Sequence, residues 1–363
     1  MHSFQRRHLL ISSVLAFSIA APAASSAQGK KLRSIEAYPD VIAERLKQRA
    51  IALKSLPENY KGINIKFVIV KDARRWKPGA KITVAFEKDA GDANLRRSVE
   101  NAANVWAQYA NIKFDFHDTN TKKYREFSAE DKEYKASIRV SFRTGNGWEG
   151  YWSAVGNDSI NSDYSKPWEP SMNLGGIERE DKDSLVGIVL HEFGHALGAE
   201  HEHQHPGSGC ADGWRWDDDA GYVSTTDGEG YLVNDRYGRR PGIYTFMSGA
   251  TDYWPRSKVD GNMRALTDQS AYDIGPFDKL SIMKYYFPSD FYLLGDKSPC
   301  FTGEAAKQLS EGDKTFIAAI YKRGEALETA ASKRQSLSDI LREFSGSAPP
   351  NTAVSDAIRF LER

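Results

Sequence analysis

The sequence predicts an α+β fold, in which a twisted mixed β-sheet packs against helices and precedes a mainly helical or irregular C-terminal part. Residues 82–86 and 138–142 carry apolar side chains at every second position, which is the period of a strand with one buried face. Residues 95–109, between them, carry apolar side chains at helical spacing. Strands interrupted by a helix in this way are typical of a mixed sheet with a helix packed on it.

Weaker patterns define the other elements of the N-terminal half. The sequence predicts a helix at 41–56, a strand at 63–70 with alternating apolar residues, and a short strand at 114–116. Residues 144–177 are rich in Gly, Asn, Trp and Pro, and we interpret them mostly as loop. Within this segment, residues 171–174 are expected to form a short strand at an edge of the sheet.

The second half of the chain begins with a strongly apolar helix. From Ser184 onward its side chains are apolar on nearly all sides, so we expect it in the core, and Gly198 is expected to end it. Residues 206–280 lack a regular period, and we expect only short elements there. A capping box at 310–313 predicts a further helix, and two amphipathic segments in 324–363 predict a helical C-terminal tail.

Composition and charge exclude several classes of function. The chain has 363 residues, 49 of them basic and 49 acidic, and a formal net charge of zero. This balance disfavours nucleic acid or an anionic membrane as the main partner. No uninterrupted apolar run reaches the roughly 18 residues that a membrane span needs. The acidic runs at 217–219 and 227–229 lack the ligand spacing of a known calcium loop, and we interpret them as solvated surface.

The first residues have the pattern of an export signal. Residues 1–27 combine two adjacent arginines, a mostly apolar stretch and a small-residue cleavage site. A secreted or periplasmic protein is therefore expected, with a buried N-terminal helix as the alternative. Residues 28–78 are interpreted as an N-terminal extension or propeptide. In an oxidising compartment Cys210 and Cys300 either form one disulfide or stay as two free thiols.

The residues that carry chemistry lie in one short segment, which reads His191-Glu192-Phe193-Gly194-His195-Ala196-Leu197-Gly198-Ala199-Glu200-His201. Residues four positions apart share a helix face, so the imidazoles of His191 and His195 converge. Glu192 is offset from that face, where it is close enough to contact a water at a metal held by the two imidazoles. Gly198 lets the backbone leave the helix and return His201 from a third direction.

Three imidazoles and an open position are the layout of a catalytic zinc site, because structural zinc sites fill all four positions with protein ligands. We therefore expect one Zn2+ per chain, with Glu192 as the general base that takes the proton of the activated water. The alternative is an ordinary buried helix. In that case two histidines and a glutamate would each need a partner to offset their desolvation.

The histidine spacing described above is the metzincin signature, which a Met-turn completes downstream. The segment Ser281-Ile282-Met283-Lys284-Tyr285 has the form of this turn and resembles the astacin family in particular. The resemblance implies a metzincin-type zincin fold, with a catalytic domain at 79–323 and Met283 beneath the zinc. It also implies that Tyr285 is a switchable fifth ligand that stabilises the tetrahedral intermediate.

Other segments fit this resemblance less closely. Residues 150–156 are similar to the family's tryptophan–serine loop, and residues 171–175 to its edge strand, where a substrate peptide adds as an extra strand. Glu202 matches the residue that pairs with the mature N-terminus in the family. Because the usual inhibitory aspartate motif is not found, Glu202 is left unassigned. His203 and His205 are interpreted as surface or supporting residues rather than ligands.

The sequence thus predicts an exported zinc endopeptidase that hydrolyses peptide bonds in a protein or peptide substrate. One alternative is a metzincin of another branch, in which Tyr285 is not a ligand. The other is a non-catalytic, zinc-containing module that binds proteins, against which the presence of Glu192 argues. The substrate, the propeptide boundary and the oligomeric state stay open.

Overall fold

The fold was analysed in a computed structural model that describes residues 36, 38–228, 230–249, 253–266, 272–324 and 327–362. The signal peptide expected at residues 1–27 lies outside this part of the chain. None of the helices in the described ranges combines the length and apolar character that crossing a bilayer requires.

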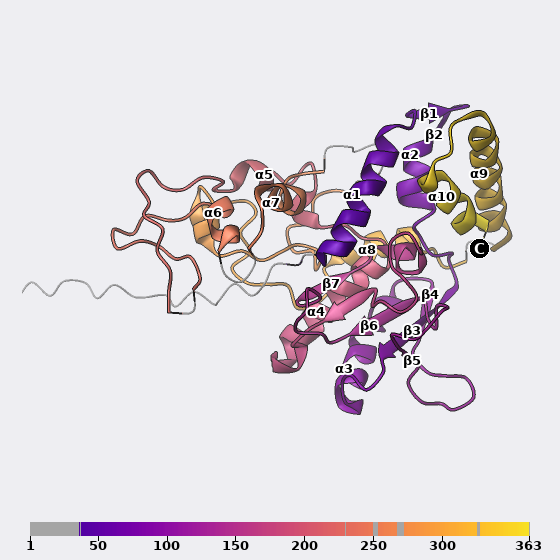
Figure 1. The fold of residues 1–363 in the computed structure, drawn as a ribbon, viewed down its shortest axis with the longest axis horizontal. Helices are drawn as coiled ribbons and strands as arrows, with labels where there is room; N and C mark the ends of the chain where they lie inside the picture. The colour runs from indigo at the N-terminus through magenta and orange to yellow at the C-terminus, as the bar shows by residue number, and fades with distance from the viewer. Residues whose placement is uncertain are drawn as a thin grey trace, which may run out of the picture. The chain divides into compact units, whose positions relative to one another are not determined.

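A mixed sheet forms the centre of the fold (Figure 1). Its strands follow the order β4-β3-β6-β8-β7, and β5 pairs with the far end of β3. All these pairs are parallel except β7 with β8, which is antiparallel. The strands are β3 (Ala80–Glu87), β4 (Ile112–Asp115), β5 (Glu126–Phe127), β6 (Ile138–Ser141), β7 (Tyr151–Ser153) and β8 (Met172–Leu174).

The prediction of an edge strand at 171–174 was wrong. The strand exists as β8, but it lies inside the sheet, parallel to β6 on one side and antiparallel to β7 on the other. All three of its residues are buried, as expected for a strand with neighbours on both sides. The edge is β7, within the segment interpreted as loop, where a three-residue strand between glycines shows no alternation long enough to detect.

The strand predicted at 63–70 is also wrong for most of its length. Only Ile63–Asn64 is extended, as β2 paired with β1 (Asn59–Tyr60). The Asn64 side chain then accepts a hydrogen bond from the Phe67 N–H and starts α2 (Ile65–Phe67), which continues into the wider turn η1 (Val68–Asp72). Buried positions 65, 68 and 69 recur at helical spacing, which outweighs the alternation in this stretch.

Two helices pack side by side on the sheet through one apolar core. The first, α3 (Ala93–Ala103), is capped by Asp92, whose carboxylate accepts from two backbone N–H groups. It is shorter than predicted, because the chain tightens after Ala103 into η2 (Trp106–Gln108). The second is the apolar helix α4 (Lys182–Ala196), which is preceded by the turns η3 (Gly156–Ile160) and η4 (Ile177–Arg179).

The C-terminal part has a second core of its own. Its short elements are η5 (Glu202–Gln204), α5 (Cys210–Gly213), α6 (Ile243–Ser248), α7 (Arg256–Met263), η7 (Ser289–Phe291) and η8 (Gly295–Lys297), in agreement with the irregular character that the sequence predicts. A disulfide joins Cys210 to Cys300. In the acidic run at 217–219, the carboxylate of Asp219 is paired with two arginines, Arg215 and Arg240.

The two ends of the described chain pack together. Helices α9 (Leu327–Ser347) and α10 (Thr352–Glu362) form a hairpin beside β1, β2, α2 and η1 (Figure 1). Their apolar face and that of residues 56–73 form one buried cluster. Helix α1 (Asp40–Lys54) begins near the histidine segment and ends near this hairpin, where the Asn351 side chain donates to the Ala52 carbonyl.

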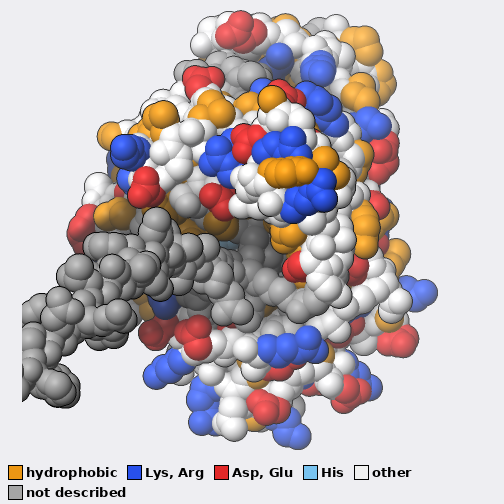
Figure 2. All heavy atoms as spheres, turned by 90° about the vertical axis from the view of Figure 1, so that its left-hand side faces the viewer, with side chains coloured by type: hydrophobic (Ala, Val, Ile, Leu, Met, Phe, Trp, Pro, Cys, Tyr) orange, Lys and Arg blue, Asp and Glu red, His pale blue; other side chains and the backbone are white. Residues whose placement is uncertain are grey.

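Charged side chains of both signs are interspersed over the face shown in Figure 2. No single sign dominates that view, in keeping with the formal net charge of zero.

Candidate metal centre

Helix α4 and the turn after it position the three histidines. The Asp181 carboxylate accepts hydrogen bonds from the N–H groups of Asp183 and Ser184 and so caps the start of the helix. His191 and His195 lie on one helix face, one turn apart. Gly198 then has a φ of 98°, a left-handed conformation that favours glycine, and the chain turns back to bring His201 beside them.

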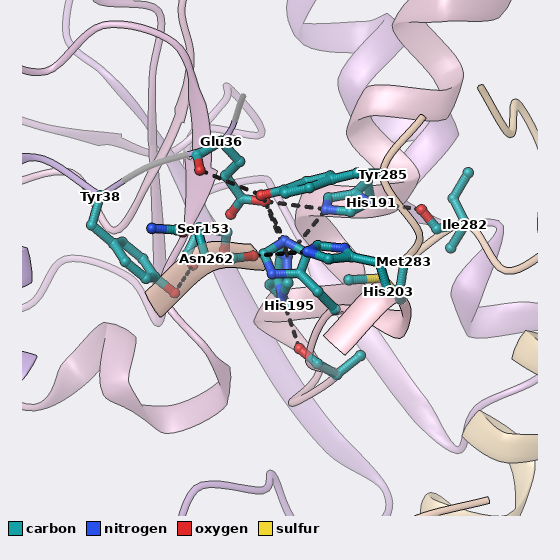
Figure 3. A network of polar contacts seen from close by, with 12 residues as sticks. Glu36, Tyr38, Ser153, His191, His195, His203, Asn262, Ile282, Met283 and Tyr285 are labelled. Atoms are coloured by element: carbon teal, nitrogen blue, oxygen red, sulfur yellow. Dashed lines mark hydrogen bonds and ion pairs between the residues drawn. The ribbon is translucent and has the colours of Figure 1, made fainter. Parts of the chain in front are cut away.

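The three imidazoles converge on one point, and Figure 3 shows two of them, His191 and His195. The Nε2 atom of His195 lies 3.2 Å from that of His191 and 3.1 Å from that of His201. A tetrahedral zinc site with Zn–N distances near 2.0–2.1 Å places its ligand atoms about 3.3 Å apart. The spacing of the nitrogens therefore fits a zinc ion.

The other ring nitrogens fix which atom faces the metal position. The Nδ1 atom of His191 lies 2.7 Å from the Ile282 carbonyl, and that of His195 lies 2.8 Å from the Ala199 carbonyl. A carbonyl oxygen only accepts, so both Nδ1 atoms carry the proton and both Nε2 atoms keep a free lone pair. Such backbone partners orient the histidine ligands of metal sites.

The predicted Met-turn lies directly against this helix. Ser281 Oγ and the Ile282 N–H both donate to the carboxylate of Asp313, which also caps α8 (Glu311–Ile320) in the predicted capping box. The turn thus positions the Ile282 carbonyl, which accepts the hydrogen bond from Nδ1 of His191. Met283 is buried, and its carbonyl accepts from the Glu202 N–H at 2.9 Å.

Glu192 is buried beside the cluster without a partner. It is 2% exposed, and its Oε2 atom has no hydrogen-bond partner among the described residues. Burial raises the pKa of its carboxyl well above the ordinary value, and the nearby charge of Glu36 raises it further.

Tyr285 borders the cluster on its other side. Its ring lies 4.3 Å from that of His201 and is stacked on that of His191. Burial raises the pKa of its phenol well above 10, and the charge of Glu36 adds to this shift. The hydroxyl is therefore protonated, and it donates to Glu36 Oε2 at 2.9 Å.

Glu36 is the site residue that sequence reasoning missed. Its Oε2 atom lies 3.1, 3.3 and 2.8 Å from the Nε2 atoms of His191, His195 and His201. The four side chains form a group whose ligand atoms all lie within 4.8 Å of one another. No local pattern marks Glu36, because it lies in a polar stretch 155 residues before His191.

The two neighbouring histidines, His203 and His205, are not among these four grouped side chains. His203 is fully buried, its Nε2 donates to the Asn262 carbonyl, and burial lowers its pKa well below 6.5. Its ring stacks on that of Tyr285 and supports it. His205 donates to the Gly275 carbonyl. Glu202 accepts from the Asp278 N–H at 2.7 Å and lines a cavity of about 1320 Å³ that His201 and Met283 also line.

Known structures were compared with this chain. One structure of myroilysin is 28% identical, with a TM-score of 0.50 over 70% of this chain and 98% of that one. A second is 29% identical, with a TM-score of 0.42 over 70% and 88%. High choriolytic enzyme 1, a hatching enzyme zinc-protease from Oryzias latipes (medaka), is 16% identical, with a TM-score of 0.36 over 69% and 96%. Only the first likeness is close enough to bear on the site. No protein-family model and no curated protein sequence matches the chain.

The chain has an astacin-like metzincin fold. The fold class and the resemblance that the sequence predicts are thereby confirmed. The likeness supports a metalloendopeptidase, and the group of three histidines and one glutamate is a site that can hold a metal ion.

Proposed function

We propose that this astacin-like chain is a zinc-dependent endopeptidase with one Zn2+ bound by His191, His195 and His201. The observation that carries the proposal is the convergence of these imidazoles, with Nε2 atoms 3.1–3.2 Å apart and two Nδ1 protons engaged elsewhere. Three neutral nitrogen ligands favour zinc over calcium or magnesium, which prefer oxygen ligands.

Each residue of the site has a separate task in peptide hydrolysis. Zinc, when bound, supplies a Lewis acid that polarises the substrate carbonyl and activates water. Glu192 accepts a proton from the attacking water at its unpaired Oε2 atom and later passes it to the leaving amine. Tyr285, protonated and beside His201, donates a hydrogen bond to the oxygen on which negative charge develops.

The same contacts support latency of the full chain. Glu36 lies where a substrate carbonyl must approach the three histidines, so its carboxylate competes with substrate for that position. Residues 28–78 are in this proposal a propeptide. Helix α1 of this segment forms two ion pairs with the catalytic part, Arg45 with Glu169 at 2.6 Å and Arg49 with Asp158 at 2.5 Å.

Two alternatives make different predictions. In a metzincin of another branch, Tyr285 is not a ligand, and Tyr285→Phe leaves the electronic spectrum of the cobalt-substituted site unchanged. In a non-catalytic module, the chain binds zinc and a protein partner but cleaves no peptide. The Oε2 atom of Glu192, buried without a partner, favours the enzyme, because such an atom lowers stability and is typical of functional sites.

The remaining assignments follow from the enzyme proposal. The substrate is a protein or peptide, the catalytic domain spans 79–323, and 324–363 is a helical tail. Export by a signal peptide at 1–27 fits the disulfide between Cys210 and Cys300, because such bonds persist in oxidising compartments.

Casein hydrolysis by zinc-loaded protein tests the proposal. The background is Glu36→Ala, which removes the competing carboxylate. In that background Glu192→Gln lowers kcat by at least about a thousandfold with zinc content unchanged, because the general base is lost. Glu178→Gln, at a half-exposed glutamate on η4, is the matched control and retains activity. Cleavage that survives Glu192→Gln or complete chelation of zinc contradicts the proposal.

A further inference from the structure

Tyr38, two residues after Glu36, reaches the sheet beside the metal centre. Its hydroxyl donates to the Ser153 carbonyl at 2.9 Å (Figure 3). Two extended residues span at most about 7 Å, so the Tyr38 backbone stays close to the point where Glu36 meets the histidines. One short segment therefore contacts both the metal position and strand β7.

The Ser153 carbonyl belongs to the open edge of the sheet. The Ala154 N–H donates to the Ser171 carbonyl, and the Gly175 N–H donates to the Gly150 carbonyl. In an antiparallel pair this pattern turns the backbone groups of Trp152 toward β8 and those of Ser153 away from it. The carbonyl that receives the Tyr38 hydroxyl is thus one that the pairing of β7 with β8 does not use.

The Tyr38 ring fills a pocket with apolar walls. It meets Trp152 edge-on at 6.3 Å and Tyr164 edge-on at 6.5 Å between ring centroids. Ala154 and Tyr164 belong to the buried cluster against which Tyr38 packs. Burial raises the pKa of Tyr38 well above 10, and proximity to Tyr164 adds to this, so the phenol in the pocket is a hydrogen-bond donor.

We propose that the pocket formed by Trp152, Ala154 and Tyr164 is a substrate subsite for a tyrosine-like side chain, which Tyr38 occupies in the full chain. This inference rests on the proposed peptidase function and extends it to the substrate class: polypeptides with tyrosine within three residues of the scissile bond. A phenylalanine side chain fills the same space but leaves the Ser153 carbonyl without a hydrogen-bond donor. We therefore expect it to bind in the pocket less tightly than tyrosine.

A binding experiment tests the pocket without reference to catalysis. In the full chain, Tyr38→Ala empties the pocket, and calorimetry measures binding of N-acetyl-tyrosinamide and N-acetyl-alaninamide. We expect the tyrosine compound to bind Tyr38→Ala at least about tenfold more tightly than it binds the wild-type chain, where Tyr38 competes. Adding Ala154→Leu fills the emptied space and abolishes this binding, whereas adding Ala129→Leu, at an exposed alanine, does not. The proposal is overturned if N-acetyl-tyrosinamide binds the wild-type chain as tightly as it binds Tyr38→Ala. It is also overturned if this compound binds Tyr38→Ala/Ala154→Leu as tightly as it binds Tyr38→Ala/Ala129→Leu.

A second experiment maps the bonds that are cut. Mass spectrometry of casein fragments from the Glu36→Ala/Tyr38→Ala chain, in which the pocket is empty, is expected to show tyrosine enriched several-fold at one position within three residues of the cut. The enrichment falls when Ala154→Leu is added to that chain and persists when Ala129→Leu is added instead. Cleavage without aromatic preference, or with a preference that Ala154→Leu leaves unchanged, refutes the subsite. If no casein is cut, the peptidase function fails, and the calorimetric result decides the pocket by itself.

Discussion

Gly194 lies where the histidine helix packs against Met283 of the Met-turn. A Cβ atom placed on Gly194 would lie 2.4 Å from the Met283 sulfur and 3.2 Å from Cζ2 of Trp106. Ordinary contacts between such atoms are about 3.5–4.0 Å, so the sulfur or the helix must move by more than about 1 Å. Met283 is 4% exposed, so this displacement takes place inside the packed core. The change Gly194→Ala therefore tests whether Met283 packs directly against the helix that carries the histidines.

The expected magnitude follows from two opposing effects. Overpacking of a buried position costs about 1–3 kcal/mol in the free energy of unfolding. Alanine is favoured over glycine inside a helix by about 1 kcal/mol. We expect a net destabilisation of about 1–2 kcal/mol, together with weaker zinc binding, because the displaced backbone carries His195. As a control, Gly346→Ala on α9 meets no atom within 4 Å and is expected to be neutral or stabilising.

Urea unfolding of a double-mutant cycle measures this contact. Met283→Ala removes the sulfur and by itself costs about 2–5 kcal/mol. In the double variant the methyl group added at position 194 no longer meets the sulfur of Met283. The combined loss in the free energy of unfolding is therefore smaller than the sum of the two single losses by about 1–3 kcal/mol. Effects that add within about 0.5 kcal/mol would show that Met283 does not press on Gly194, and the reasoning would fail.

Three further outcomes follow from other parts of the structure. Lys284 is 6% exposed, donates to the Tyr285 carbonyl, and burial lowers its pKa to about 8. Below pH 8 both folded and unfolded states are protonated and the penalty is complete, and it is relieved as pH rises toward the unfolded pKa of 10.5. Lys284→Met should accordingly raise stability at pH 7 by about 2 kcal/mol in urea titrations and by less at pH 10, and a destabilised variant speaks against this. Replacing both Cys210 and Cys300 by serine frees a loop with a sequence separation of 90 and should cost up to about 4 kcal/mol, whereas an unchanged Tm contradicts it. Phe360→Ala in the α10 core should cost about 3–5 kcal/mol, and a loss below 1 kcal/mol would mean that the C-terminal hairpin contributes little.

The convergence of the three histidines could be predicted from sequence because the geometry that brings them together is local. His191 and His195 share a helix face by spacing alone, and Gly198 permits the reversal that returns His201. The Met-turn was accessible for the same reason, since its residues adjoin one another in the chain. Distances between these segments, such as that from His191 to the Ile282 carbonyl, had to come from the fold.

Features set by contacts between distant segments were missed. Glu36 meets histidines more than 150 positions away, and a lone glutamate in a polar stretch carries no periodic signal. The place of β8 inside the sheet depends on β7, a strand of three residues. Residues 65–69 were misassigned because alternating and helical spacing share some of the same apolar positions, and only packing against α10 distinguishes them.

Zinc content tests the central claim most directly. After dialysis against metal-free buffer, elemental analysis of the folded full-length chain should find one zinc per chain. His195→Ala should lose it, whereas His205→Ala, which alters a histidine hydrogen-bonded outside the cluster, should keep it. A folded chain without stoichiometric zinc, or zinc that persists in His195→Ala, would contradict the account.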